Sequence, residues 1–333
     1  MANALSPRER VAAVLNGESP DRMPASTWRH FYDQEMTVQG EIDSLIAFQQ
    51  RYNWDYLKIN LRAQYHCEDW GVAFKYTGSP HDSPTLERTP IKRASDWGNL
   101  DALNPAKGNL GEHLKVIHGL RRQLGPDLPM LMTLFTPLGI AARMVPSEDL
   151  MKQHLLENPK AVHAALEAIT ETFSKYVPLC LEAGADGLFF ATLGFGTYDR
   201  MTDEQYDEFV RPYDMALLKA AKEGWFNMLH VCRSNNMLRK LADYPVHAFN
   251  WDAQDPTNPT LAQGLEIVDG VVVGGIPQQK IATMTPDQVK EVVRDAIDQT
   301  GGHRFMIGSG CTMSTHTPHE NLVAITEALS EAS

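Results

Sequence analysis

The feature that most constrains the fold is a series of eight short apolar segments, separated mostly by stretches with the residue spacing of amphipathic helices. Each segment has the length of a buried β-strand. Strands that alternate with helices predict a parallel sheet, and eight repeats in about 300 residues match a (β/α)8 TIM barrel. We therefore expect an α/β protein with one domain over residues 1–333. The eight segments are 22–27, 56–61, 129–135, 187–192, 226–232, 247–252, 271–276 and 304–311.

Helix signals support this division of the chain. The segment SPRERVAAVLNG predicts a first helix with Ser6 as N-cap, Pro7 at the first helical position, Glu9 closing a capping box and Gly17 ending it. In the second half, residues 203–224 and 285–301 each predict one helix between strands.

One connection is too long for a simple barrel repeat. Residues 66–128 contain the strand-like pieces GVAFKY and TLERTPIK and the helical stretch EHLKVIHGLRRQL. Long loops in compact domains are usually functional. We interpret this segment as an insertion between strands 2 and 3 that lies over the barrel mouth.

Composition limits the partners. The formal charge of −12 and the pI near 5.4 come without a basic stripe, which argues against nucleic acid. No apolar run approaches the length of a membrane span, and the N-terminus lacks a signal-peptide core. Four scattered cysteines suit a reducing compartment rather than a disulfide framework. We expect a cytoplasmic protein that acts on a small-molecule substrate, and a homodimer is left open.

A split set of soft donors is the strongest chemical signal. His230 and Cys232 are two residues apart, so on a strand both side chains leave the same face. Cys311 follows much later, at the end of the eighth predicted strand. One imidazole and two thiols are a common zinc donor set, and three ligands with an open position are typical of a catalytic rather than a structural site. Each residue also has an ordinary interpretation as core filler or as a hydrogen-bonded histidine.

Other polar residues follow the predicted strands, where TIM barrels carry their chemistry. We expect Asp252 and His30 to act in catalysis, although an Asp at this position also serves as a helix N-cap or as a hydrogen-bond partner for His230. The expected substrate-binding residues are Arg29, Asn60, Arg62, Thr192, Tyr198, Arg233 and Asn250.

The chain resembles the uroporphyrinogen decarboxylase superfamily, and within it the zinc-dependent methylcobalamin:thiol methyltransferases of the coenzyme M type. The motifs that carry the resemblance are RERVAAVLNGESPDRMP, GADGLFF, MTDEQYDEFVRPYD, LHVC, VVVGGI and GCTMSTHTPHENLVA. The resemblance implies that His230, Cys232 and Cys311 bind Zn²⁺. It also implies a corrinoid methyl donor and a thiol acceptor. The chain has no D-x-H-x-x-G corrinoid-binding pattern, so a separate corrinoid protein or free methylcobalamin must supply the donor.

One departure keeps other functions open. The methyltransferases usually continue with Gly after the first ligand Cys, where this chain has Arg233. The first alternative is a decarboxylase-like lyase that acts on a small carboxylic acid and uses Arg29 or Arg62. The second is a barrel that binds a ligand without turnover, because a fold alone does not establish catalysis.

Overall fold

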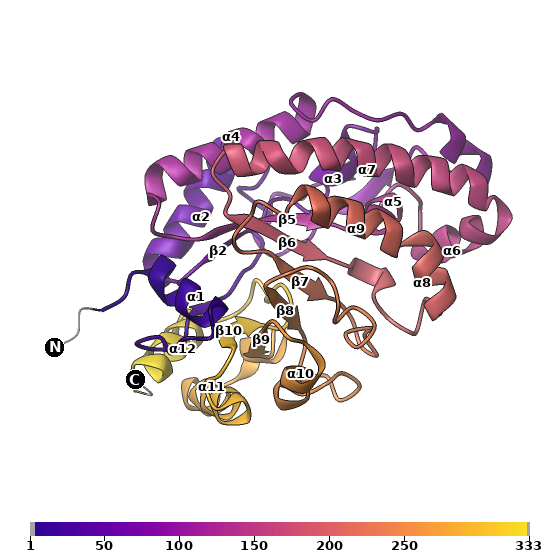
Figure 1. Cartoon of the computed structure of the whole chain (residues 1–333). Helices are drawn as coiled ribbons and strands as arrows, with labels where there is room; N and C mark the ends of the chain where they lie inside the picture. The colour runs from indigo at the N-terminus through magenta and orange to yellow at the C-terminus, as the bar shows by residue number, and fades with distance from the viewer. Residues whose placement is uncertain (1–3, 332–333) are drawn as a thin grey trace.

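The computed structural model describes residues 4–331, and all eight predicted strands join one parallel sheet (Figure 1). The strand order is β1-β10-β9-β8-β7-β6-β5-β2. Every residue of these strands is buried, as expected for a parallel sheet that is covered on both faces. The strands are β1 (Ala25–Ser26), β2 (Leu57–Ile59), β5 (Met130–Phe135), β6 (Gly187–Ala191), β7 (Met228–Val231), β8 (Ala248–Trp251), β9 (Val271–Ile276) and β10 (Phe305–Ser309).

The two outer strands of this order, β1 and β2, meet and close the barrel. The backbone N–H of Asp55 donates to the carbonyl of Ala25 at 2.8 Å. The hydroxyl of Ser26 donates to the carbonyl of Tyr56 at 2.6 Å. The fold is therefore the predicted (β/α)8 barrel.

Helices surround the barrel (Figure 1). The capping box of α1 is formed as predicted, since Ser6 accepts from the N–H of Glu9 and Glu9 accepts from the N–H of Ser6. The α-helices are α1 (Pro7–Leu15), α2 (Val38–Tyr52), α3 (Tyr65–Glu68), α4 (Gly108–Leu124), α5 (Pro137–Ala141), α6 (Glu148–Glu157), α7 (Pro159–Glu182), α8 (Asp203–Phe209), α9 (Arg211–Ala220), α10 (Leu261–Ile267), α11 (Pro286–Thr300) and α12 (His319–Glu331). Short 3₁₀ turns are η1 (Ala94–Asn99), η2 (Leu193–Phe195) and η3 (Lys280–Thr283).

The prediction of one helix over residues 203–224 is wrong in one respect, because the chain forms two helices there, α8 and α9. The break falls at Val210, whose φ of −121° and ψ of −61° lie outside helical values. Pro212 lies in the first turn of the second helix, and proline cannot donate the backbone hydrogen bond that a continuous helix needs.

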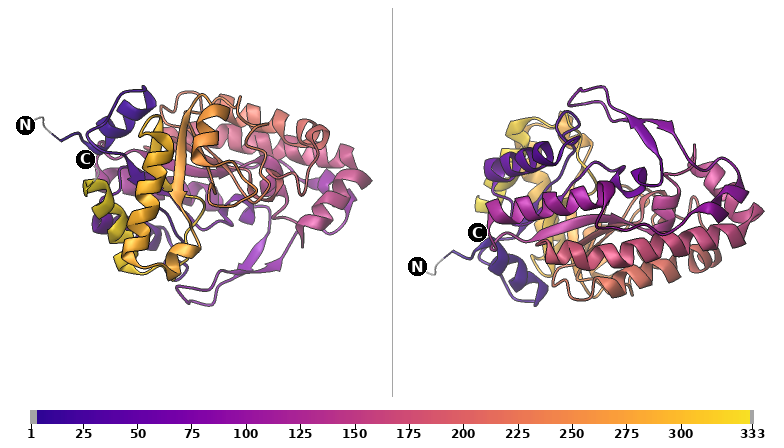
Figure 2. Two further views of the ribbon diagram at one scale, coloured as in Figure 1. Left: turned by 90° about the horizontal axis from the view of Figure 1, so that it is seen from below. Right: turned by 90° about the horizontal axis from the view of Figure 1, so that it is seen from above.

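The segment predicted as an insertion, 66–128, has two parts. A hairpin of β3 (Ala73–Lys75) and β4 (Thr85–Arg88) projects from the body (Figure 2). Its connection reaches the loop before α12, where the rings of His81 and His316 stack at 4.2 Å. The second part ends in α4, which packs beside α2 as an outer barrel helix. α4 therefore belongs to the regular repeat, and an insertion over the barrel mouth stays a prediction for the hairpin.

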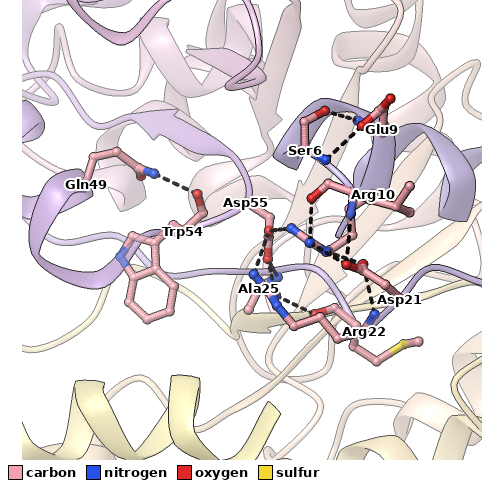
Figure 3. A network of polar contacts seen from close by, with 11 residues as sticks. Ser6, Glu9, Arg10, Asp21, Arg22, Ala25, Gln49, Trp54 and Asp55 are labelled. Carbon is pink, nitrogen blue, oxygen red and sulfur yellow. Dashed lines mark hydrogen bonds and ion pairs between the residues drawn. The ribbon is translucent and has the colours of Figure 1, made fainter. Parts of the chain in front are cut away.

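A buried carboxylate ties the first helix to the barrel (Figure 3). Asp55 is 1% exposed and accepts from Arg10 at 2.6 Å, from Arg22 at 2.7 Å and from the backbone N–H of Ala25 at 2.8 Å. Arg10 also pairs with Asp21. The network links α1 to the strands that close the barrel.

Within residues 4–331, no helix is long and apolar enough to cross a membrane.

Candidate active site

The three predicted soft donors meet at the carboxyl end of the barrel. His230 lies on β7, Cys232 directly follows that strand, and Cys311 follows β10. All three line one cavity, so the two-residue spacing does place His230 and Cys232 on one face. The Cys232 thiol donates a hydrogen bond to Cys311, which lowers the pKa of Cys311 well below its ordinary value, and the neighbouring side chain of His230 lowers it further. The pKa of Cys232 is raised by the same hydrogen bond and by burial.

Asn250 fixes the orientation and the tautomer of His230. The side-chain amide of Asn250 donates to the carbonyls of Val273 at 2.9 Å and Ser309 at 3.1 Å, so its oxygen must face His230. That oxygen lies 2.6 Å from Nδ1 of His230. An amide oxygen only accepts, so Nδ1 carries the proton and Nε2 presents a lone pair.

The donor set fits a soft metal ion. Nε2 of His230 is buried without a hydrogen-bond partner, which is unusual for a buried polar atom. It lies in the cavity wall with the two thiols. In residues 4–331, no three His, Cys, Asp or Glu side chains already stand in a metal-binding arrangement. The three donors are of the kinds that bind zinc, and His230 has the tautomer that this requires, while the two thiols are hydrogen-bonded to each other.

The backbone of Cys232 is also held in place. Its N–H donates to the hydroxyl of Thr192 at 3.1 Å. Thr192 is 1% exposed and follows β6. Thr192 and Asn250, both predicted to bind substrate, thus lie behind the soft donors and position them.

Two cavities meet at the thiols. The inner cavity has a volume of about 120 Å³ and reaches into the barrel. The outer cavity has a volume of about 680 Å³ and lies between the loops of the mouth. Both are lined by Arg143, Leu193, Cys232, Cys311 and Thr312. The thiols therefore stand at the boundary between a small chamber and a wide vestibule.

The two residues predicted to act in catalysis lie on opposite sides of this boundary. His30 lines the inner cavity, and its Nδ1 lies 2.9 Å from a carboxylate oxygen of Glu35. Asp252 lines the outer cavity and accepts from the amide of Gln278 at 2.6 Å. The hydrogen bond to His230 that was considered for Asp252 is made by Asn250 instead.

The predicted substrate-binding residues divide in the same way. Asn60 lines the inner cavity, and Arg233 lines the outer one, where it pairs with Glu148 at 3.3 Å. Arg62 pairs with Glu68 at 2.9 Å and lines neither cavity. Two more of the predicted residues lie outside both cavity walls. The guanidinium of Arg29 lies over the ring of Phe31, and Tyr198 is exposed.

Two cations at the site were not predicted from the sequence. Lys58 lies on β2 and is 4% exposed, with its ammonium 4.7 Å from the ring centre of Phe189. Burial lowers the pKa of Lys58 to about 7, although the nearby thiols of Cys311 and Cys232 oppose this shift. Arg143 follows α5 and has a buried, unpartnered Nε. A charged residue inside the apolar run YLKINL was the available signal for Lys58.

Fold and site together define a class: a TIM-barrel protein with one imidazole and two thiols at the carboxyl end of its strands. Residues 30–332 match the uroporphyrinogen decarboxylase (URO-D) family, and the chain belongs to this family.

Relatives and solved structures extend the comparison over nearly the whole chain. A methylcobamide:CoM methyltransferase of Methanosarcina acetivorans is 22% identical over 97% of both chains. A methylated-thiol–coenzyme M methyltransferase of Methanosarcina mazei is 26% identical over 99% of this chain and 91% of that protein. The solved structure of a methyltransferase from Methanosarcina mazei covers 98% of this chain and 99% of its own, with a TM-score of 0.84 at 18% identity. This last likeness shows a shared fold.

Proposed function

We propose that the protein is a zinc-dependent methyltransferase or demethylase component that moves a methyl group from a corrinoid, or from a methylated small molecule, to a thiol or a similar acceptor. The observation that carries the proposal is the tautomer of His230. Asn250 holds the proton on Nδ1 and leaves Nε2 without a partner in the wall that contains Cys232 and Cys311. The names of the methyltransferase relatives support the reaction class.

The residues that would hold Zn²⁺ are His230 through Nε2 and Cys232 and Cys311 through their sulfurs. When bound there, the ion would convert an acceptor thiol, whose ordinary pKa is about 8.5, into a thiolate at neutral pH. Two thiolate ligands leave little residual positive charge on the ion, so the acceptor sulfur keeps its nucleophilicity. Thr192 and Asn250 keep the donors in place by the hydrogen bonds described above.

The two cavities give the acceptor and the methyl donor separate approaches. The inner chamber suits a small acceptor, and the outer vestibule suits a large donor or the cofactor of a docked corrinoid protein. In the transfer, the acceptor sulfur forms a bond to the methyl carbon. A corrinoid donor would keep both electrons of the broken cobalt–carbon bond, and the proton of the acceptor thiol would pass to solvent.

The positions of Arg29 and Arg62 remove the predicted basis of the lyase alternative, although Lys58 and Arg143 still place cations in the cavity wall. A carboxylate substrate needs cationic groups in the cavity wall. Arg62 is held by Glu68, and Arg29 lies outside both cavities. The arginines on which that alternative depends are therefore not where a substrate would sit.

The test combines metal content with a methyl-transfer assay. Wild type, Cys311→Ser and the control Cys180→Ala are purified without added metal, and zinc is measured by mass spectrometry. Transfer from free methylcobalamin to a panel of thiols is then followed by the absorbance of the corrinoid. Cys180 is fully buried in α7, away from the site, so its variant controls for loss of a thiol.

We expect about one zinc per chain in wild type and in Cys180→Ala, and a sharp loss in Cys311→Ser, together with thiol-dependent demethylation that follows zinc content. If wild type takes up no zinc on reconstitution, the proposal is wrong. Demethylation that survives complete chelation would contradict it equally.

A further inference from the structure

Two of the four cysteines form a pair within one chain. Cys232 directly follows β7 and Cys311 follows β10, and a hydrogen bond joins the two thiols. Both side chains line the inner cavity and the outer vestibule. Thiols that contact each other in this way can be joined by a disulfide bond after a small shift of the turn that carries Cys311.

The pair is open to small oxidants. Cys311 is partly exposed, and the vestibule that it lines has a volume of about 680 Å³, which is ample for a peroxide molecule. Lys58 and Arg143 line the inner cavity together with the thiols, whereas no Asp or Glu of the described chain lines it. Reactive cysteines in proteins are typically found in partly exposed, electropositive surroundings of this kind.

The other two cysteines have neither property. Cys67 and Cys180 are both fully buried, and neither lines the inner cavity or the vestibule. The thiol of Cys67 donates to the carbonyl of Gln64 at 3.3 Å, and Cys180 is hydrogen-bonded to Tyr176. Buried thiols without access to solvent are inert toward oxidants. Oxidation of the folded chain should therefore be selective for the pair.

We propose that Cys232 and Cys311 are a site of reversible oxidation, at which a peroxide converts the zinc-free protein into a form with an intramolecular disulfide bond. The more exposed sulfur, that of Cys311, attacks one peroxide oxygen, the O–O bond breaks, and Cys311 becomes a sulfenic acid. The sulfur of Cys232 then attacks the sulfur of Cys311, and the hydroxyl group leaves as water. In total, the two thiols lose two electrons and two protons, and hydrogen peroxide is reduced to two molecules of water.

The disulfide would act as a switch on the metal site. It removes both sulfur donors and leaves His230 alone, so the oxidised chain cannot hold zinc through this donor set. A second thiol beside a sulfenic acid also prevents its further, irreversible oxidation, so a thiol reductant restores the site. Only this consequence depends on the proposed function, because the disulfide itself forms in protein without metal.

The test counts thiols and identifies the bond. Zinc-free wild type, Cys232→Ser, Cys311→Ser and the control Cys180→Ala are first shown to be folded by thermal unfolding and are then treated with equimolar hydrogen peroxide. Free thiols are counted with a chromogenic disulfide reagent after denaturation. Linked peptides are identified by mass spectrometry without reduction, and a 1,3-dione is added in parallel to capture sulfenic acid.

Wild type is expected to lose two of its four free thiols and to yield one linked peptide pair that contains Cys232 and Cys311. Cys180→Ala should lose the same two thiols, and a thiol reductant should restore them. Cys232→Ser should form no intramolecular disulfide and should instead carry the captured sulfenic acid on Cys311. Zinc-loaded wild type should keep its thiols, because bound zinc would engage both sulfurs.

Three results overturn the proposal: wild type that keeps all four thiols, oxidation that involves Cys67 or Cys180, and a disulfide that joins two chains on a non-reducing gel. The outcomes for the proposed function are separate. If wild type takes up no zinc but forms the Cys232–Cys311 disulfide, the proposed function fails and the oxidation site stands. If zinc binds and methyl transfer proceeds but no disulfide forms in the zinc-free protein, the oxidation site fails and the proposed function stands.

Discussion

Nδ1 of His230 lies 2.6 Å from the amide oxygen of Asn250, and this contact determines which ring nitrogen is available to a ligand. Removing the partner of a metal-ligating histidine typically weakens metal binding about 10- to 100-fold. We expect Asn250→Ala to weaken zinc binding by this amount, measured by competition with a chromogenic chelator. Asn250→Asp keeps an oxygen that accepts from Nδ1 and should bind zinc more tightly than the alanine variant. An unchanged zinc affinity in Asn250→Ala would show that the contact does not serve the metal.

The four cysteines give a second, independent measure of the metal site. Cys67 and Cys180 are fully buried, whereas Cys311 is partly exposed and Cys232 lines both cavities. A chromogenic disulfide reagent should react quickly with none of the thiols in native, zinc-loaded protein, because zinc binds two and burial protects two. After chelation, up to two thiols per chain should react, and added zinc should restore protection. Rapid reaction of Cys232 and Cys311 in protein that contains zinc would place the ion elsewhere.

Stability should depend strongly on Asp55. This carboxylate is 1% exposed and pairs with Arg10 and Arg22 (Figure 3). Removing one partner of a buried ion pair typically costs about 3–5 kcal/mol, because the remaining charge is left buried. We expect Asp55→Ala to lower the free energy of unfolding in urea by this amount and to leave the zinc content of the folded fraction unchanged. Asp21→Ala removes the more exposed partner of Arg10 and should have a smaller effect.

The barrel could be predicted from the sequence because its strands are marked by local patterns. Each strand is a short apolar run, and the capping box of α1 is indicated by the spacing of Ser6 and Glu9 in the sequence. The break between α8 and α9 was missed because the apolar spacing continues across Val210, although Pro212 was a visible signal. The position of the hairpin 73–88 depends on contacts with distant loops and has no local pattern.

The meeting of His230, Cys232 and Cys311 at one cavity could be predicted for a similar reason, since their spacing and their strand ends are local features, and their role as metal ligands stays a prediction. The positions of Lys58 and Arg62 could not be predicted in this way. Strand alternation places Lys58 and Asn60 on one face, but in a parallel barrel both faces are buried, so the pattern does not say which face is inside. Arg62 follows the same strand and was expected at the mouth, yet Glu68 of the short α3 holds it elsewhere. Such pairings depend on side-chain geometry that appears only after folding.

A buried carboxyl group away from the site makes stability depend on pH. Asp214 is fully buried in α9, where the hydroxyls of Tyr206 and Tyr244 donate to one oxygen at 3.2 and 2.9 Å and the other oxygen has no partner. Burial raises the pKa of Asp214 well above 3.8, although the two tyrosine hydrogen bonds oppose this shift. The folded state therefore keeps a proton that the unfolded state loses above pH 3.8.

It follows that the contribution of Asp214 to stability is greatest below pH 3.8 and falls as pH rises toward the folded-state pKa. Asp214→Asn removes this titration while keeping an oxygen that accepts from the tyrosines. At pH 7 we expect the variant to have a higher free energy of unfolding than wild type, because the amide does not carry the free-energy cost of a buried carboxyl group that would be ionised in the unfolded chain. The difference should shrink as the pH is lowered toward 4, in urea titrations at several pH values.

The control is Asp243→Asn, because Asp243 is an exposed carboxylate that pairs with Arg211. This variant should not change the pH dependence in the same way. A difference between Asp214→Asn and wild type that is independent of pH would mean that Asp214 is ionised in the folded protein and that its two tyrosine hydrogen bonds outweigh the cost of burial.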